Sequence, residues 1–549
     1  MVLSMNILQI FYRLIKLVFP LTGYMLCAIL MGVAGFLCAI GIPTLAGMAL
    51  IQLLGLNGFL NLKTICILLF VFALIRGILR YAEQACNHYI AFKLLARIRD
   101  LVFSALRKLC PAKLESKDKG GLIALITSDI ELLEVFYAHT ISPICIAFLT
   151  SFICIVLQSH VHFLAALYAC VAYMIVGVAL PLYISKKSQN LGVAYRNEAA
   201  NLNSYVLESM RGIKESMQYM DTMNRLDGLN HKTDELAQKE KELKKFQAKT
   251  ISLTNFWVIF LSLGMFVLHE LLQIPLYQSI PSFVLQISSF GPVIALANLG
   301  SSLSQTIGAA NRVLSLLDEK PEVQEVVDGN RAKFDAIQIE NVDFAYKQEP
   351  ILTDMNMEIS KQEVIGIQGK SGSGKSTLLK LLMRFWDVQS GHIKVDDYDI
   401  QSLNTSNLRK NEGYVTQETI LFHDTIENNL RIAKETASKE QIVEACKKAN
   451  IHDFITSLPD GYQTMIEELG SSLSAGQIQR LGLARMFLHD SKLVLLDEPT
   501  SNLDSLNEGI ILKSIYEGRK DKTIVFVSHR ESTLSHCDRI IHMDTGRVS

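Results

Sequence analysis

Long stretches without charged residues alternate with charged stretches over the first 300 residues. No Asp, Glu, Lys or Arg occurs in residues 17–62, 64–75 or 136–184, and residues 250–301 contain only Glu270. A membrane-spanning helix needs about 20 mostly apolar residues. The pattern therefore predicts six spans. They are residues 17–40, residues 62–82, two halves of 136–184 divided near Gln158-Ser159-His160, residues 251–272 and residues 279–301.

Turn-forming residues and basic residues place these spans. We expect the first span to end near Gly41-Ile42-Pro43, and the last two to be separated near Ile274-Pro275. Lys and Arg are concentrated between the second and third spans and between the fourth and fifth. Because such residues stay on the cytoplasmic side, we expect both termini and both long loops to be cytoplasmic. No cleaved signal peptide is expected, because the first apolar run is too long for one.

The two long loops continue the spans as helices. Residues 83–112 carry apolar residues at helical spacing, and breaks follow at residues 116–121 and around Arg211-Gly212. Helix ends near 111–121 and 205–216 are therefore candidates for contact with a soluble domain. Residues 302–320 are expected to form a last helix, within a membrane region that covers residues 1–320.

Beyond the last helix, the pattern changes to that of a soluble domain. Residues 321–335 are polar and contain Pro and Gly, which is typical of a linker. Residues 336–549 alternate strand-like and helical runs, which predicts an α/β domain. The predicted fold is an α-helical membrane domain with six transmembrane helices, followed by an α/β domain.

Composition and charge exclude several classes of protein. The chain has 549 residues, 49% of them hydrophobic and 19% charged, with a formal net charge of −1. A polybasic nucleic-acid binder is excluded by that balance, so we expect no nucleic-acid partner. The ten Cys show no CxxC or zinc-ligand spacing. Most lie in apolar runs, where a free Cys behaves as a small hydrophobic residue.

The strongest chemical signal is a phosphate-binding loop at residues 369–376. The sequence Gly-Lys-Ser-Gly-Ser-Gly-Lys-Ser fits GxxxxGK[ST], between an apolar strand-like run and a helical run. Backbone N–H groups of such a loop surround phosphate oxygens. Lys375 would reach the β- and γ-phosphates of ATP, and Ser376 would bind Mg²⁺. The expected nucleotide-binding residues here are Gly369, Ser371, Gly372, Gly374, Lys375, Ser376 and Thr377.

A second apolar run, residues 493–496, ends in Asp497-Glu498. Two acids after a buried strand are weak evidence alone, but they have the form of a Walker B motif downstream of a phosphate loop. Asp497 would hold Mg²⁺, directly or through water. Glu498 would orient and deprotonate the attacking water.

Between these motifs, Leu473-Ser474-Ala475-Gly476-Gln477 resembles the LSGGQ signature of ABC ATPases, with Ala475 at the first glycine position. Further family elements occur in the family's order. The resemblance implies that Tyr346 stacks on adenine, that Gln417 is the Q-loop ligand of Mg²⁺, that Asp504 lies in the D-loop, and that His529 is the switch histidine. With Glu498, Gln417 and His529 complete the expected catalytic set. The domain is expected to be a P-loop ABC ATPase that uses ATP and Mg²⁺.

The same resemblance implies a dimer. Ser474, Gly476 and Gln477 would contact the γ-phosphate held by a second chain, so one chain is half of a transporter. Six spans ahead of one ATPase domain resemble an ABC exporter that works by alternating access in the bacterial cytoplasmic membrane. We expect Ala475 to be tolerated or mildly weakening. The C-terminus after Val548 is short for this family, so we expect a naturally short end or a truncated chain.

Within the exporters, scattered positions resemble the CydC subunit of the CydDC thiol-reductant exporter family. They include residues 76–83, His88, residues 129–137 and Ser142-Pro143. The resemblance implies export of cysteine- or glutathione-type thiols by a heterodimer, and haem binding in some members. The alternative is a homodimeric lipid, drug or peptide exporter.

Two basic residues in the second span are candidate substrate ligands. Arg76 and Arg80 lie one helical turn apart, on one face. They could bind a substrate carboxylate or haem propionates, because charges at such depth usually face a cavity or a partner. Snorkelling to the interface, or pairing with Glu83, explains them equally well. His88 is a candidate haem ligand, although a structural role is the more common one for such a histidine.

Overall fold

The computed structural model describes residues 6–55, 60–115, 119–297, 299–346, 349–467, 470, 472–544 and 547–548. The chain divides into two compact units. The membrane unit comprises Met1–Lys108 and Lys117–Glu319, and the ATPase unit comprises Leu109–Ser116 and Lys320–Ser549.

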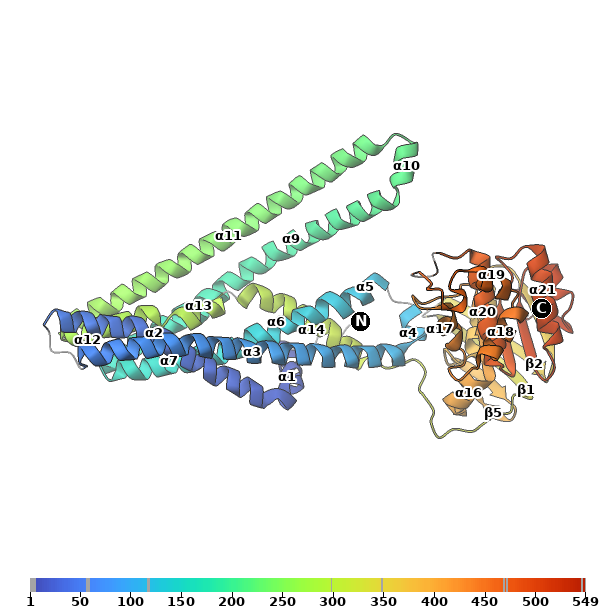
Figure 1. Cartoon of the computed structure of the whole chain (residues 1–549), viewed down its shortest axis with the longest axis horizontal. Helices are drawn as coiled ribbons and strands as arrows, with labels where there is room; N and C mark the ends of the chain where they lie inside the picture. Colours follow the sequence, from blue (N-terminus) through green and yellow to red (C-terminus); the bar gives the residue numbers. More distant parts are fainter. Residues whose placement is uncertain are drawn as a thin grey trace. The chain divides into compact units, whose positions relative to one another are not determined.

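The membrane unit is helical throughout its described residues (Figure 1). Short π-helical turns at residues 125–129, 137–141 and 175–179 connect some of the helices. The helices are α1 (Ile7–Val18), α2 (Thr22–Leu53), α3 (Leu62–Leu109), α5 (Lys119–Ala124), α6 (Ile130–Phe136), α7 (Ser142–Ser159), α8 (Phe163–Met174), α9 (Leu180–Arg211), α10 (Ile213–Gln218), α11 (Thr222–Leu271), α12 (Leu276–Ser288), α13 (Gly291–Ala297) and α14 (Leu299–Asp318).

Six segments among the described residues are long and apolar enough to span a membrane, as the charge-free runs predict. The expected break near Gln158-Ser159-His160 is confirmed, because α7 ends at Ser159. The break near Ile274-Pro275 is confirmed too, since α12 begins at Leu276. The second and fifth spans are much longer than predicted, because α3 and α11 continue as charged helices well beyond their apolar parts.

The first span departs from the prediction at Pro43. We expected it to end there, and this is wrong, because α2 continues to Leu53 with Pro43 inside the helix. The residues that follow are apolar, and in a membrane a helix is the structure that pairs its backbone groups internally. Thr44 also donates its hydroxyl to the Ile40 carbonyl at 2.8 Å, within the same turn. Pro43 is therefore accommodated in the helix instead of ending it.

Helices α9 and α11 form a long hairpin closed by the short helix α10 (Figure 1). The hydroxyl of Tyr205 on α9 donates to the Arg225 carbonyl on α11 at 3.2 Å. A Cβ at Gly228 would lie 2.3 Å from that hydroxyl, so glycine permits the close approach of the two helices. The expected break around Arg211-Gly212 is where α9 ends.

The ATPase unit contains two sheets. A four-stranded antiparallel sheet has the order β2-β1-β4-β5, and a six-stranded sheet has the order β10-β9-β3-β8-β7-β6, parallel except for β10. The strands are β1 (Ala336–Tyr346), β2 (Glu349–Ser360), β3 (Val364–Gly369), β4 (Ser390–Val395), β5 (Tyr398–Asp399), β6 (Glu412–Val415), β7 (Leu493–Asp497), β8 (Thr523–Val527), β9 (Arg539–Asp544) and β10 (Arg547–Val548).

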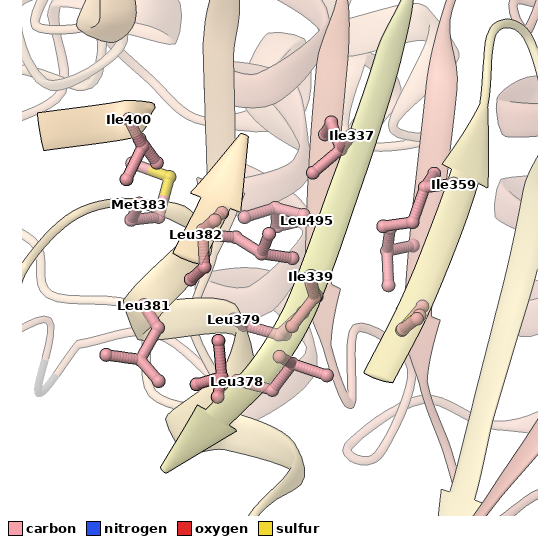
Figure 2. Packing of buried hydrophobic residues seen from close by; sticks show 14 of the residues in the cluster. Ile337, Ile339, Ile359, Leu378, Leu379, Leu381, Leu382, Met383, Ile400 and Leu495 are labelled. Carbon is pink, nitrogen blue, oxygen red and sulfur yellow. The ribbon is translucent and has the colours of Figure 1, made fainter. Parts of the chain in front are cut away.

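Helices cover these sheets and complete an apolar core. Figure 2 shows Ile337 and Ile339 of β1 packed with Leu378 and Leu379 of α15, beside Leu495 of β7. The α/β fold predicted for this part of the chain is present. The helices are α15 (Lys375–Leu382), α16 (Thr405–Asn411), α17 (Ile426–Arg431), α18 (Lys439–Lys448), α19 (His452–Ser457), α20 (Ala475–His489), α21 (Ser505–Glu517) and α22 (Glu531–Leu534).

The short helix α4 (Ala112–Glu115) packs within the ATPase unit, although the sequence division placed it in the membrane region. Ala112 belongs to the apolar core of that unit. Glu115 accepts from the Lys380 ammonium at 2.9 Å. Residues 109–116 thus belong to the ATPase unit. Residues 116–118 of the expected break lie outside the described residues.

Candidate functional site

The phosphate loop follows β3, a central strand of the parallel sheet, and leads into α15. Gly372 and Gly374 have φ angles of 82° and 94°, which L side chains rarely adopt. A Cβ at Gly369 would lie 2.3 Å from the Met543 carbonyl oxygen. These glycines are therefore required by backbone geometry, and they leave the loop open beside the start of α15.

Lys375 lies buried at the first position of α15. Its ammonium donates to the carbonyl oxygens of Gly369 at 2.8 Å and Lys370 at 2.7 Å. Burial lowers the pKa of Lys375, while the nearby carboxylates Glu498 and Asp497 oppose that shift. The hydroxyl of Ser373 is buried without a hydrogen-bond partner among the described residues. A buried cation and an unpaired hydroxyl are what phosphate oxygens would satisfy, so the loop fits ATP.

The predicted metal ligands of the phosphate loop and β7 lie side by side. The hydroxyl of Ser376 donates to Asp497 Oδ1 at 3.1 Å, and the hydroxyl of Tyr414 donates to Asp497 Oδ2 at 3.3 Å. Burial raises the pKa of Asp497, with Ser376 and Tyr414 opposing the rise. Hydroxyl and carboxylate oxygens are the ligands that Mg²⁺ prefers. Ser376 and Asp497 would therefore suit a magnesium ion bound with ATP, whose charge would offset that of the phosphates.

The three predicted catalytic residues come together at Glu498. Gln417 donates to Glu498 Oε2 at 3.4 Å, and His529 Nε2 lies 3.5 Å from Glu498 Oε1. Glu498 has a φ angle of 49°, and its N–H donates to the Val527 carbonyl at 2.9 Å. That bond holds this strained residue at the end of β7, beside β8. A carboxylate next to an imidazole and an amide can orient a water molecule for attack on a phosphate.

The expected adenine-stacking residue, Tyr346, ends β1 and is half-buried. Its ring contacts Trp386 edge to face, with centroids 5.4 Å apart, and Phe344 at 5.0 Å. Aromatic neighbours hold the ring in place at the rim of the site. Asp504 caps the start of α21 and accepts from the Asn507 N–H at 2.9 Å. That backbone bond lowers the pKa of Asp504.

The signature segment forms the start of α20. Ser474 accepts from the Gln477 N–H, and Gln477 accepts from the Ser474 N–H at 2.8 Å, a reciprocal capping box. Ser474 and Ala475 are exposed. A Cβ at Gly476 would lie 3.1 Å from the Asn502 carbonyl oxygen. The exposed start of a 15-residue helix carries the positive end of the helix dipole, which suits an anion.

Sequence patterns did not single out Gln479 or Tyr414. Gln479 is buried on α20, donates to the Glu498 carbonyl at 3.0 Å and accepts from the Asn502 N–H at 3.1 Å. It therefore links the signature helix to the Walker B residue and the D-loop. Tyr414 pairs in register with Leu495 on the adjacent strand β7, and its hydroxyl reaches Asp497. Tyr414 lies two residues before Thr416-Gln417. The pairing of β6 with β7 could therefore have located Tyr414 near Asp497.

The candidate substrate residues lie on α3 but have different surroundings. Arg80 donates to Glu83 at 2.6 Å, and its guanidinium lies 5.8 Å from the centre of the Phe36 ring. Pairing with Glu83, which was one alternative, is thus present for Arg80. Arg76 is exposed. His88 is also exposed, and its ring stacks on Phe92 with centroids 6.0 Å apart.

Comparisons with known proteins agree with this arrangement. Residues 7–272 match the family described as ABC transporter transmembrane region, and residues 352–501 match the family described as ABC transporter. A probable ABC transporter ATP-binding/permease protein of Haemophilus influenzae is 47% identical over 98% of both chains. A putative multidrug export ATP-binding/permease protein of Bacillus subtilis is 29% identical, over 98% of this chain and 95% of that one.

A solved structure of a bacterial Atm1-family ABC exporter with ATP bound has the same fold. The TM-score is 0.82 over 96% of this chain and 94% of that chain, at 22% sequence identity. This likeness shows the fold, a helical membrane region with an ATPase domain. None of these comparisons supports haem binding.

Proposed function

The chain belongs to the ABC transporter family and is an ATP-driven exporter, and from this premise we propose that its substrate is a small thiol with a carboxylate group. The observation that carries the proposal is Arg76, an exposed cation in the spanning part of α3. A cation at such depth is retained where it meets a cavity or an anionic partner. The resemblance to the CydC subunit supplies the thiol, and Arg76 supplies recognition of the carboxylate.

Arg76 is better suited to this role than Arg80. The Arg80 guanidinium already pairs with Glu83, whose side chain is only 4% exposed. Breaking that pair would leave a buried carboxylate without its cation, which is strongly unfavourable. The Arg80 guanidinium is therefore engaged with Glu83 on the same helix. Arg76, one turn away, remains available to a substrate.

We propose further that two such chains form the working exporter. The signature residues Ser474, Gly476 and Gln477 form an exposed helix start, which would complete the ATP site of a second chain. Lys375, Ser376 and Asp497 would hold the nucleotide and Mg²⁺ in the first chain, and Glu498 would activate water. A heterodimer with a related subunit is preferred, on the same resemblance. From the basic loops we propose that both termini and the ATPase unit lie in the cytoplasm of a bacterial cell.

Export of an apolar, drug-like molecule is the second candidate. A specific observation favours it, because the exposed side of α3 carries large apolar residues over the same depth as Arg76. They are Ile67, Phe70, Leu74, Ile78 and Tyr81. The Bacillus subtilis relative is named as a putative multidrug exporter. Such a substrate would pack on these side chains and would need no cation.

Stimulation of ATP hydrolysis separates the two candidates. The purified dimer in lipid nanodiscs is assayed with glutathione, with cysteine and with an apolar dye. We expect stimulation by the thiols, and its loss in Arg76→Gln. Arg99→Gln, an exposed arginine of the same helix outside the apolar part, is the matched control and should behave as the unaltered protein. Stimulation by the dye alone, unchanged in Arg76→Gln, would favour the drug-like substrate instead.

A further inference from the structure

Helix α12 carries a polar stripe inside the membrane unit. Ser279, Ser282, Gln286 and Ser289 recur every three or four residues from α12 into the residue that follows it, and each is at most 3% exposed. Residues at this spacing share one helix face. This stripe therefore lies inside the packed helices, away from lipid, where each polar group needs a partner.

The outer part of the stripe is hydrogen-bonded to neighbouring helices. The two ring nitrogens of His269 on α11 lie 3.2 Å from the hydroxyls of Ser279 and Ser282. Gln158 on α7 donates to the Ser282 carbonyl at 2.9 Å, and Ser282 donates its hydroxyl back to the Gln158 amide oxygen. His269 and Gln158 are fully buried. Three helices thus share one polar cluster near the α7–α8 and α11–α12 turns.

The other end of the stripe is bonded as well. The hydroxyls of Ser289 and Tyr173 lie 2.5 Å apart, and Ser289 donates to the Gln286 carbonyl at 2.8 Å. Cys154 of α7 lies in the same buried core as Tyr173, which is on α8. Cys154 lies one turn before Gln158 on the same buried face of α7. The two clusters therefore lie one helical turn apart along α7.

Gln286 lies between the two clusters along α12, and it is the residue of the stripe whose side chain is not hydrogen-bonded to another described residue. Its side chain is fully buried, yet neither the amide nitrogen nor the amide oxygen has a hydrogen-bond partner among the residues that the structure describes. A primary amide has two donors and one acceptor. Leaving all of them unmet in a membrane interior is unfavourable, and protein interiors meet such groups with bound water.

We propose that Gln286 binds ordered water, which joins the His269–Ser282–Gln158 cluster to the Ser289–Tyr173–Cys154 cluster. The result is one hydrated polar seam between α7, α8, α11 and α12. A buried water needs two to four polar partners. The Gln286 amide supplies its first partners, and the hydroxyls on either side of it along α12 supply the others.

The seam is tested by X-ray radiolysis of the full-length dimer in nanodiscs, because hydroxyl radicals form from bound water in place. Two buried tyrosines serve as reporter and control. Tyr173 belongs to the seam, whereas Tyr137 is 1% exposed and donates to the Leu14 carbonyl. We expect labelling of Tyr173 to exceed that of Tyr137 several-fold in the unaltered protein. Equal labelling of the two would overturn the proposal.

Gln286→Met removes the amide at similar volume, and Gln278→Met, on the same helix but half-buried, is its control. We expect Gln286→Met to reduce Tyr173 labelling several-fold and to lower the unfolding temperature, because the neighbouring hydroxyls lose their water. Gln278→Met should change neither value. In a dry seam, Gln286→Met would relieve an unpaired amide, so a raised unfolding temperature with unchanged labelling contradicts bound water. If Gln286→Met does not fold, the comparison of Tyr173 with Tyr137 decides the question.

Discussion

Glu412 offers the sharpest test of how the ATPase unit is built. It begins β6, the strand that leads into the Q-loop residue Gln417, and its side chain is buried. One carboxylate oxygen accepts from Arg409 at 3.1 Å, and the other has no partner among the described residues. Burial raises the pKa of Glu412 to about 8, although the charge of Arg409 opposes the rise. We predict that Glu412→Gln stabilises the unit, increasingly so at higher pH.

The magnitude follows from proton linkage. A glutamate in the unfolded chain has a pKa of 4.5. Between pH 4.5 and pH 8 the folded carboxyl stays protonated while the unfolded one is ionised, so the free energy of unfolding falls as pH rises. Each pH unit in that window removes about 1.4 kcal/mol. Glu412→Gln escapes this loss, which amounts to about 1 kcal/mol at pH 5.5 and about 5 kcal/mol above pH 8.

Thermal unfolding of the full-length protein in detergent measures the effect. The chain has two tryptophans, Trp257 in α11 and Trp386 in the ATPase core. In a Trp257→Phe background, Trp386 fluorescence follows the ATPase unit alone. We expect Glu412→Gln to raise the unfolding temperature by about 2–4 °C at pH 5.5 and by about 10–20 °C at pH 8.5.

Glu340→Gln is the matched control. Glu340 is a carboxylate on β1 with a side chain 44% exposed, which pairs with Lys394. Its removal should change the unfolding temperature little, and equally at both pH values. A Glu412→Gln effect that is the same at pH 5.5 and pH 8.5, or that is destabilising at pH 8.5, would refute the argument from burial.

Three further predictions concern the site and its neighbours. Gln479→Met removes two buried hydrogen bonds, so we expect a loss of about 2 kcal/mol of stability. We also expect the rate of ATP hydrolysis to fall by a larger factor than the nucleotide affinity, which is measured by equilibrium binding. Lys380→Glu should destabilise by no more than about 1 kcal/mol, because the pair with Glu115 is partly exposed, and adding Glu115→Lys should restore the unfolding temperature. Ala475→Gly should change ATPase activity only slightly, because the Ala475 methyl group is exposed; an increase by orders of magnitude would contradict this.

Charge patterning predicted most of the membrane unit because burying an unpaired charge in lipid is so unfavourable. All six spans follow from runs with few or no Asp, Glu, Lys or Arg residues. A different criterion failed at Pro43, where turn-forming residues suggested an end to the first span although the charge-free run continues to residue 62. In water, a proline inside a helix usually ends or kinks it. In a membrane the alternatives to a helix are worse, so the apolar residues after Pro43 decide the outcome.

The proximity of the candidate nucleotide-binding residues to one another was predictable for a different reason. Gly374, Lys375 and Ser376 are consecutive residues of one loop, so their spacing along the chain fixes their positions relative to one another. Glu498 meets Gln417 and His529 only through the pairing of β6, β7 and β8, and there the family resemblance supplied what spacing could not. Gln479 was missed because its two partners lie about 20 residues further along the chain.

Neutral polar residues expose the limit of patterning most clearly. Ser279, Ser282 and Gln286 carry no charge, so a span that contains them passes every test based on charge. Their consequences depend on which helix faces them, and only packing decides that. Glu412 is the converse case, because a charge count treats it as any surface carboxylate although it lies inside the domain. In both places an unpaired buried atom identifies the group: at Glu412 the carboxylate is kept at a cost in stability, and at Gln286 the amide is expected to bind water. Such groups are the ones where substitution is most informative.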